Sequence, residues 1–206
     1  MKTLFPMFMK LAGRTVLVVG AGNVAESKIS SLLETGANIR VVALQASERV
    51  HELARSGEIA LEKRAFTVSD LEGAFAVIVA TNSCELHELI FLEAQARGIL
   101  CNVVDVPEQC DFFYPAVVRR GDLQIAISTA GQSPSLAQKL RAQLERQFGP
   151  GWADWVARLG ETRREVLRST LNAEQKMSLL HSLASREAFE AMLSGEAANH
   201  AGEEAA

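Results

Sequence analysis

Two glycines and an alanine near the N-terminus have the spacing of a phosphate-binding turn. Gly20, Gly22 and Ala25 form the pattern G-x-G-x-x-A, between a β-branched run at residues 15–20 and helically spaced apolar residues. In this setting the first glycine permits a tight turn, the second lets a pyrophosphate approach, and the alanine allows close helix–sheet packing. The first N–H groups of the helix then meet the phosphate charge. The motif predicts a dinucleotide site, with a structural turn in a nucleotide-free domain as the alternative.

The residue that usually binds the adenosine ribose in such a site is missing. A dinucleotide domain often carries an acidic residue about 20 residues further on, at the end of its second strand. Here the second apolar run, residues 39–44, ends in Leu44 and is followed by Gln45. Gln45 and backbone groups must therefore serve the ribose. The chemistry of these residues leaves the choice between NAD and NADP open.

One carboxylate is placed for acid–base chemistry. Asp105 follows the apolar run at residues 99–104, and ligands of open α/β sheets bind outside the carboxyl ends of the strands. Asp105 is therefore a candidate acid or base, with a capping or loop-stabilising role as an equal alternative. The histidines are scattered, and we interpret each as a surface or structural residue: His51, His87, His181 and His200. No cluster has metal-ligand spacing, so no resident metal is expected.

A stretch of small, hydroxylated residues lies further along the chain. Residues 128–134 read STAGQSP, and Ser133 suits a helix N-cap with Pro134 at the first helical position. Backbone N–H groups at such a junction, with Lys139 and Arg141 on the following helix, can hold carboxylates. An ordinary capped loop is an equal alternative.

The elements that must position these residues alternate between strand and helix. Strands are expected at residues 15–20, 39–44, 59–61, 75–80 and 99–104, with helices after the glycine motif, after Ser47 and over residues 84–97. In the last helix Leu86, Leu89, Ile90 and Ala94 are expected to face inward, with Gly98 as the stop. The alternation predicts an α/β fold with a Rossmann-like parallel sheet.

The pattern changes after Pro107. Residues 113–118 and 123–128 predict a β-hairpin around a turn that contains Gly121, and a helix should follow to about Phe148. Residues 152–193 are helical in pattern throughout, and the last dozen residues should fray. We therefore expect a nucleotide-binding domain (1–112), a dimerisation segment (113–148) and a small all-helical C-terminal domain (149–206). The apolar face of the hairpin predicts a homodimer formed through residues 113–145, since a two-stranded unit cannot bury it alone.

Composition excludes several classes. The chain has 206 residues, 48% of them hydrophobic, with a formal net charge of −4. No apolar run reaches the roughly 18 residues of a membrane span, and no signal peptide is expected. Residues 119–168 hold 9 Lys/Arg against 5 Asp/Glu in an otherwise acidic chain, which favours a local anionic ligand over nucleic acid. Three cysteines without C-x-x-C spacing predict buried or half-buried thiols, no disulfide framework and a cytoplasmic protein.

Taken together, these motifs resemble the precorrin-2 dehydrogenase/sirohydrochlorin ferrochelatase family, which is also the front module of siroheme synthase. The matching segments are 5–11 (FPMFMKL), 18–28 (VVGAGNVAESK), 80–81 (AT), 101–107 (CNVVDVP), 113–116 (FYPA) and 128–134 (STAGQSP). The resemblance implies NAD-dependent oxidation of precorrin-2 to sirohydrochlorin, in many members followed by insertion of Fe²⁺ to give siroheme. The alternative from another class is a regulatory module that only senses NAD.

The resemblance also implies roles for individual residues. Asp105 takes the place of the family's catalytic aspartate. Cofactor contacts fall on Gly20, Gly22, Asn23, Val24, Leu44, Gln45 and Thr81, and substrate contacts on Ser128, Thr129, Gly131 and Lys139. Thr129 stands where some relatives have a serine that can be phosphorylated.

Overall fold

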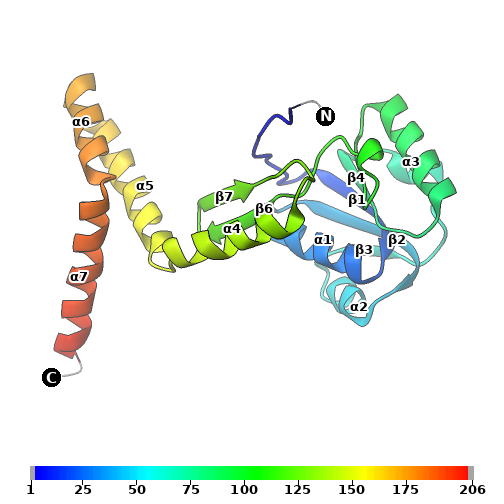
Figure 1. The fold of residues 1–206 in the computed structure, drawn as a ribbon, viewed down its shortest axis with the longest axis horizontal. Coiled ribbons are helices and arrows are strands. Elements are labelled where there is room, and N and C mark those ends of the chain that lie inside the picture. Colours follow the sequence, from blue (N-terminus) through cyan, green and yellow to red (C-terminus); the bar gives the residue numbers. More distant parts are fainter. Residues whose placement is uncertain (1–2, 204–206) are drawn as a thin grey trace. The chain divides into compact units, whose positions relative to one another are not determined.

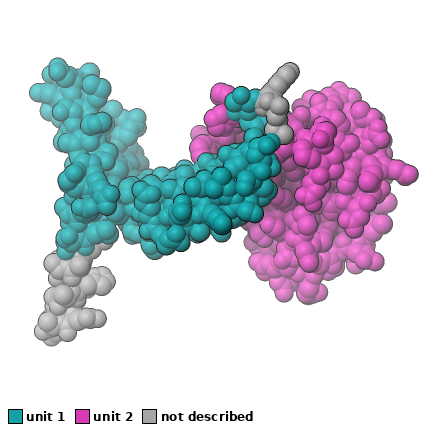
Figure 2. Space-filling model, in the orientation of Figure 1, with its two compact units in different colours: residues 1–4, 115–206 teal, residues 5–114 magenta. Residues whose placement is uncertain are grey.

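The computed structural model describes residues 3–203, with side chains described through residue 194. The chain forms two compact units, one of residues 5–114 and one of residues 1–4 with 115–206 (Figure 2). The first unit holds a parallel sheet, and the second holds a hairpin and the remaining helices. The division into residues 1–112, 113–148 and 149–206 stays a prediction.

The first unit is built on a five-stranded parallel sheet of order β3-β2-β1-β4-β5 (Figure 1). Its strands are β1 (Thr15–Ala21), β2 (Asn38–Ala46), β3 (Ala60–Glu62), β4 (Ala76–Val79) and β5 (Leu100–Val103). The chain order reverses between β1 and β4, which pair directly. Ligands of open α/β sheets bind at such a reversal. The predicted Rossmann-like sheet is confirmed.

Helices cover both faces of the sheet. On one face lie α1 (Asn23–Leu33) and α2 (Glu48–Arg55), and on the other lies α3 (Cys84–Arg97). Successive residues of a strand point to opposite faces. Val16 and Val18 therefore join the first core, while Leu17 and Val19 join the second. Burial on both faces explains why β1 is a continuous apolar run rather than an alternating one.

The predicted helix boundaries hold where a cap fixes them. The Ser47 hydroxyl accepts the Val50 N–H at 3.3 Å at the start of α2, and Ser83 caps α3 in the same way. Gly98 ends α3 with φ +66°, a left-handed conformation that glycine adopts at no steric cost.

Two side-chain predictions on α3 are wrong. Leu89 is 43% exposed, because the buried face of the helix passes through His87, Ile90 and Ala94 instead. Cys84 is exposed because it is the first residue of the helix, whereas Cys101 is buried and Cys110 is half-buried.

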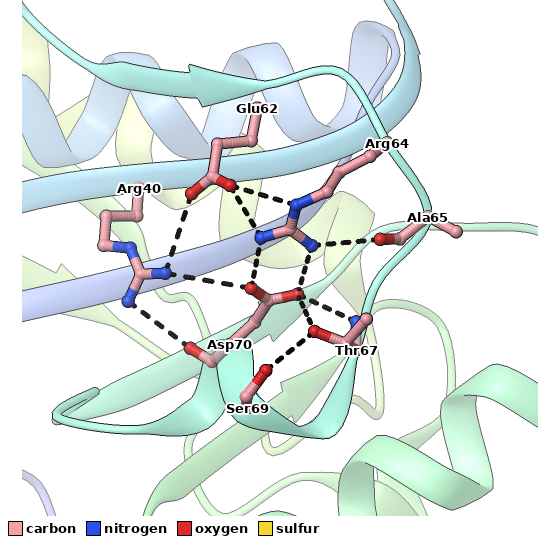
Figure 3. Close-up of polar contacts among 7 residues, drawn as sticks. All are labelled: Arg40, Glu62, Arg64, Ala65, Thr67, Ser69 and Asp70. Carbon is pink, nitrogen blue, oxygen red and sulfur yellow. Dashed lines mark hydrogen bonds and ion pairs between the residues drawn. The ribbon is translucent and has the colours of Figure 1, made fainter.

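A polar network at the β3 side of the sheet has no counterpart in the sequence analysis (Figure 3). Asp70, 3% exposed, accepts two hydrogen bonds from the Arg64 guanidinium at 2.6 and 2.8 Å and one from the Thr67 N–H at 2.8 Å. Arg64 also binds Glu62 of β3. The Arg64 hydrogen bonds lower the pKa of the Asp70 carboxyl to about 2, against the effect of its burial. The network holds the 3₁₀ turn η1 (Val68–Leu71) against the sheet.

The second unit begins with the predicted hairpin. Strands β6 (Ala116–Arg120) and β7 (Leu123–Ile127) pair antiparallel around Gly121 and Asp122. Helix α4 (Pro134–Gln147) packs on the face of the hairpin that carries Arg120. The Arg120 guanidinium donates to the carbonyls of Glu145 in the helix and of Phe148 directly after it. That face carries the alternating apolar residues, including the buried Val118. The apolar face of the hairpin therefore packs against a helix of the same chain, which was not predicted from the sequence.

Three helices complete the second unit: α5 (Trp152–Arg168), α6 (Ala173–Leu183) and α7 (Arg186–Glu203). Aromatic contacts join the start of α5 to the end of α4 and to α7, with the Trp152 ring centroid 4.9 Å from that of Phe148 and 4.5 Å from that of Phe189. Helix α7 continues to Glu203, and the rest of the predicted frayed tail lies outside the described residues. None of the helices in the described part of the chain is both long and apolar enough to cross a membrane.

Candidate functional site

The carboxyl end of the parallel sheet gathers most of the predicted site residues. Because all five strands run in the same direction, the residues that end or follow β1, β2, β4 and β5 meet at one end of the sheet. The predicted residues brought to this end are Gly20, Gly22, Asn23, Val24, Leu44, Gln45, Thr81 and Asp105. Ser128, Thr129, Gly131 and Lys139 belong to the second unit.

Gly20 is required by the protein itself. It has φ +104°, and a Cβ atom built on it would lie 2.2 Å from the Ala80 carbonyl oxygen. The end of β1 therefore approaches the end of β4 more closely than any side chain allows. Next to it, the Cγ2 of Thr81 lies 3.3 Å from the same Cβ position. The first glycine serves this close approach as well as the turn that the motif predicts.

Gly22 is not required by the protein. It is the N-cap of α1 with φ −84° and ψ −173°, an extended conformation that any residue adopts. A Cβ atom on Gly22 would meet no described atom within 4 Å. No described side chain caps this helix, so the first N–H groups of α1, those of Asn23 and Val24 among them, keep their hydrogens for another acceptor. An open glycine before uncapped helix N–H groups fits a pyrophosphate.

The end of β2 offers an exposed apolar surface and a carboxylate from elsewhere. Leu44 is 74% exposed, and Gln45 is exposed beside it. The Ser47 hydroxyl donates to the Glu26 carboxylate at 2.8 Å, and the Ser47 N–H donates to the Ala21 carbonyl at 2.9 Å. Glu26 of α1 thus brings a negative charge beside the end of β2. Glu26 was not predicted as a site residue, because the sequence signal for a ribose-binding acid lies at the end of the second strand and not on the first helix.

Thr81 is held in place by a histidine. The His87 Nε2 lies 2.8 Å from the Thr81 carbonyl oxygen and 3.0 Å from its hydroxyl oxygen. His87 is 8% exposed, so its ring fixes the loop after β4 from inside the fold. The interpretation of His87 as a structural residue agrees with these contacts.

Asp105 has an unusual backbone. Its φ is +64°, and it is the third residue of a turn closed by the Val106 N–H on the Val103 carbonyl at 3.2 Å. Left-handed residues other than glycine are uncommon and gather at functional sites. The carboxylate is exposed and accepts no hydrogen bond from the described residues. No side-chain hydrogen bond among the described residues assigns Asp105 a capping role, and its part in acid–base chemistry stays a prediction.

Lys28 is near enough to Asp105 for the carboxylate to raise the pKa of its ammonium, and it was not assigned a role from the sequence. Its ammonium stands 4.0 Å from the centroid of the Tyr114 ring, a distance suited to cation–π attraction. Burial lowers the pKa of Lys28, and the nearby Asp105 and Cys110 act in the opposite direction. Burial also raises the pKa of Tyr114 to about 12, so its phenol stays neutral. In the sequence, Lys28 stood out only as the last residue of segment 18–28, one of the segments that carry the family resemblance.

The hydroxyl-rich loop of the second unit is held by its own side chains. The Ser128 hydroxyl accepts the Ala130 N–H, and the Thr129 hydroxyl accepts the Ser133 N–H, both at 3.1 Å. Ala130 and Gly131 both have positive φ, as in a type I′ turn. The predicted Ser133 cap on α4 is present. Lys139 is exposed on α4, whereas Arg141 bonds Glu145.

Two families match the chain in consecutive segments. A family described as "Putative NAD(P)-binding" matches residues 7–116, and a "Sirohaem biosynthesis protein central" family matches residues 120–147. The first match covers the whole carboxyl end of the sheet, and the second covers the hairpin turn, β7, the hydroxyl-rich loop and α4.

Curated relatives extend the similarity. The chain is 39% identical over 168 residues to siroheme synthase 1 of Serratia proteamaculans and 42% identical over 163 residues to siroheme synthase of Ectopseudomonas mendocina. These alignments cover 82% and 79% of this chain but 35% of each relative. The siroheme synthase of Methylobacillus flagellatus is 36% identical over 98% of this chain and 43% of its own length. The chain thus spans between a third and a half of these relatives.

One solved structure matches nearly the whole chain. SirC, a precorrin-2 dehydrogenase, is 27% identical with a TM-score of 0.77, and the match covers 90% of this chain and 92% of SirC.

Proposed function

Because the chain belongs to the NAD(P)-binding family that matches residues 7–116, we propose that it oxidises precorrin-2 with NAD as the hydride acceptor. The product is sirohydrochlorin, and the reaction is a step of siroheme biosynthesis. Precorrin-2 loses a hydride to NAD and a proton to a base, which gives sirohydrochlorin, NADH and H⁺.

The observation that carries the proposal is the likeness to SirC over 90% of the chain. It includes the helical part, which a nucleotide-binding fold alone would not require. The siroheme synthases match the same region. An NAD sensor would need neither an exposed base at a strand end nor a second unit with this likeness.

The carboxyl end of the sheet supplies the cofactor contacts in this proposal. The Asn23 and Val24 N–H groups, beside the open Gly22, bind the pyrophosphate, because no described side chain caps this helix end. Leu44 and Gln45 contact the adenosine half at the end of β2, and Thr81 lines the site beside Gly20. When bound, NAD supplies the hydride acceptor.

Asp105 is the proposed base. Its carboxylate is exposed at the end of β5 and makes no bond within the described fold, so it is available to a proton on the substrate. A positioned base of this kind contributes about 10²–10⁴ to the rate. Lys28 stabilises the charged carboxylate from the side of Tyr114.

The second unit is proposed to bind the acidic side chains of the macrocycle. Ser128, Thr129 and Gly131 offer hydroxyl and backbone groups, and Lys139 adds an exposed ammonium. The loop bonds that hold Ser128 and Thr129 leave their hydroxyl hydrogens to donate to a carboxylate.

We also propose a homodimer through residues 113–145. The two-stranded sheet has an open backbone edge on each strand in the described part of the chain, and α4 exposes Leu136 at 48%. Open edges and exposed apolar residues are features that a second copy can cover. A concentration-independent monomer in sedimentation would contradict this arrangement. A cytoplasmic location stays a prediction from the cysteine pattern.

The test is an anaerobic assay of the purified chain with precorrin-2 and NAD. We expect the absorbances of NADH and sirohydrochlorin to rise together and to correspond to equal amounts of the two products. Binding of NAD without turnover would support the sensor alternative instead. A second arm adds Fe²⁺ as a substrate after NADH formation. Siroheme formation above the uncatalysed rate would show metal insertion by the wild type. If Asp105→Asn, supplied directly with sirohydrochlorin and Fe²⁺, also loses this acceleration, one base serves both reactions.

A further inference from the structure

We infer that Glu26 is a specificity-determining residue that favours NAD over NADP. The inference rests on the proposed function, in that it requires a dinucleotide at the carboxyl end of the sheet. It concerns the 2′ position of the adenosine ribose, where the two cofactors differ by one phosphate.

The fold holds Glu26 between the two places that a dinucleotide occupies. Its helix begins at Gly22, where the pyrophosphate is expected, and its carboxylate accepts the Ser47 hydroxyl at 2.8 Å, directly after β2. The Ser47 N–H binds the Ala21 carbonyl, between the two motif glycines. The end of β2 is therefore drawn alongside the glycine turn, and the carboxylate stands at their junction. This is where Rossmann domains bind the adenosine ribose.

The hydrogen bond from Ser47 occupies one oxygen of the Glu26 carboxylate and leaves the other available to a ligand. The Ser47 oxygen already accepts the Val50 N–H as the cap of α2, so its hydrogen goes to the Glu26 Oε2. The Oε1 has no partner among the described residues. An oxygen free to accept a hydrogen bond suits a ribose 2′-hydroxyl. A 2′-phosphate would instead bring a charge of about −2 beside the carboxylate.

At the end of β2, Leu44 and Gln45 carry no charge that could offset this repulsion. Arg49, in the first turn of α2, is paired with the Glu52 carboxylate at 3.1 Å. The acid that the sequence lacks on β2 is thus supplied by α1. Glu26 follows directly after Ala25 of the glycine motif, whereas the ribose-binding acid of a dinucleotide domain usually lies about 20 residues further on.

The experiment measures the dissociation constants of NAD and NADP by calorimetry for three proteins. Wild type should bind NAD at least about tenfold more tightly than NADP. Glu26→Gln keeps an oxygen for the Ser47 hydroxyl and removes the charge, so it should narrow the preference by about tenfold, mostly by tightening NADP. That change is equivalent to about 1.4 kcal/mol. Ser47→Ala is the matched control, since it removes the hydroxyl partner and keeps the carboxylate. It should retain the preference for NAD.

ADP and its 2′-phosphorylated analogue should repeat the pattern, which would place the effect at the adenosine half. Equal weakening of NAD and NADP in Glu26→Gln would make Glu26 a structural link and overturn the inference. A wild type that binds both dinucleotides equally would also overturn it, while leaving the proposed function in place. If the folded wild type binds neither, the proposed function fails together with the inference.

Discussion

Replacing Asp105 by glycine should separate the stability of its turn from the chemistry of its carboxylate. The residue has φ +64°, and a left-handed conformation costs most L-residues about 1–2 kcal/mol but glycine nothing. Aspartate often recovers part of this cost through a local hydrogen bond, which Asp105 does not make within the described residues. We expect the free energy of unfolding of Asp105→Gly to lie within about 1 kcal/mol of wild type. Asp105→Ala, which keeps the strain, should be up to about 1 kcal/mol less stable than Asp105→Gly.

Activity, unlike stability, should fall strongly in every variant that lacks the carboxylate. Asp105→Gly, Asp105→Ala and Asp105→Asn all remove the base, so turnover should fall by about 10²–10⁴, or roughly 3–5 kcal/mol of transition-state stabilisation. Denaturant unfolding followed by circular dichroism measures the stability, and NADH formation from precorrin-2 at saturating NAD measures the turnover. NAD affinity is the internal control and should not change. A loss of more than about 2 kcal/mol of stability in Asp105→Gly would refute the reasoning, since the carboxylate would then hold the turn. So would full turnover in Asp105→Asn.

Substitutions at the two motif glycines should have different effects, on NAD binding at Gly22 and on stability at Gly20. Gly22→Asp should abolish NAD binding in calorimetry with an unchanged circular dichroism spectrum, because its Cβ meets open space and its carboxylate opposes the pyrophosphate; retained affinity would contradict the cofactor placement. Gly20→Ala should lose about 2 kcal/mol or more of stability, because its Cβ overlaps the Ala80 carbonyl; normal unfolding would show that β1 can move away. Asp70 has a folded-state pKa of about 2 against an ordinary 3.8, so its stabilisation, about 2 kcal/mol, is complete above the ordinary value and lost as the pH falls toward 2. Acid unfolding of Asp70→Asn should lack this component, and identical pH curves would exclude it.

The sequence predicts the first unit well because its signals are local. Apolar runs buried on both faces mark the strands, and Ser47 and Gly98 mark helix ends through bonds to nearby backbone. Which side of α3 is buried depends instead on contacts with the rest of the fold. His87 on the buried side contacts the loop after β4, and with the helix in this orientation Leu89 is exposed. The link from Arg40 to the Asp70 backbone carbonyl is also invisible in the sequence, because the two residues are 30 positions apart.

The evidence for a ligand lies in the features that the chain does not use itself. Gly22 is a glycine where the backbone would accept any residue and where an added Cβ would touch no described atom. Asp105 holds a left-handed conformation without a bond in return, and Leu44 is 74% exposed at a strand end. Gly20, by contrast, is explained by the Ala80 carbonyl alone and says nothing about a cofactor. Natural proteins break local rules chiefly at functional sites. Three such exceptions at one end of one sheet are therefore stronger evidence than the glycine pattern, which cannot tell an internal glycine from one that leaves room for a ligand.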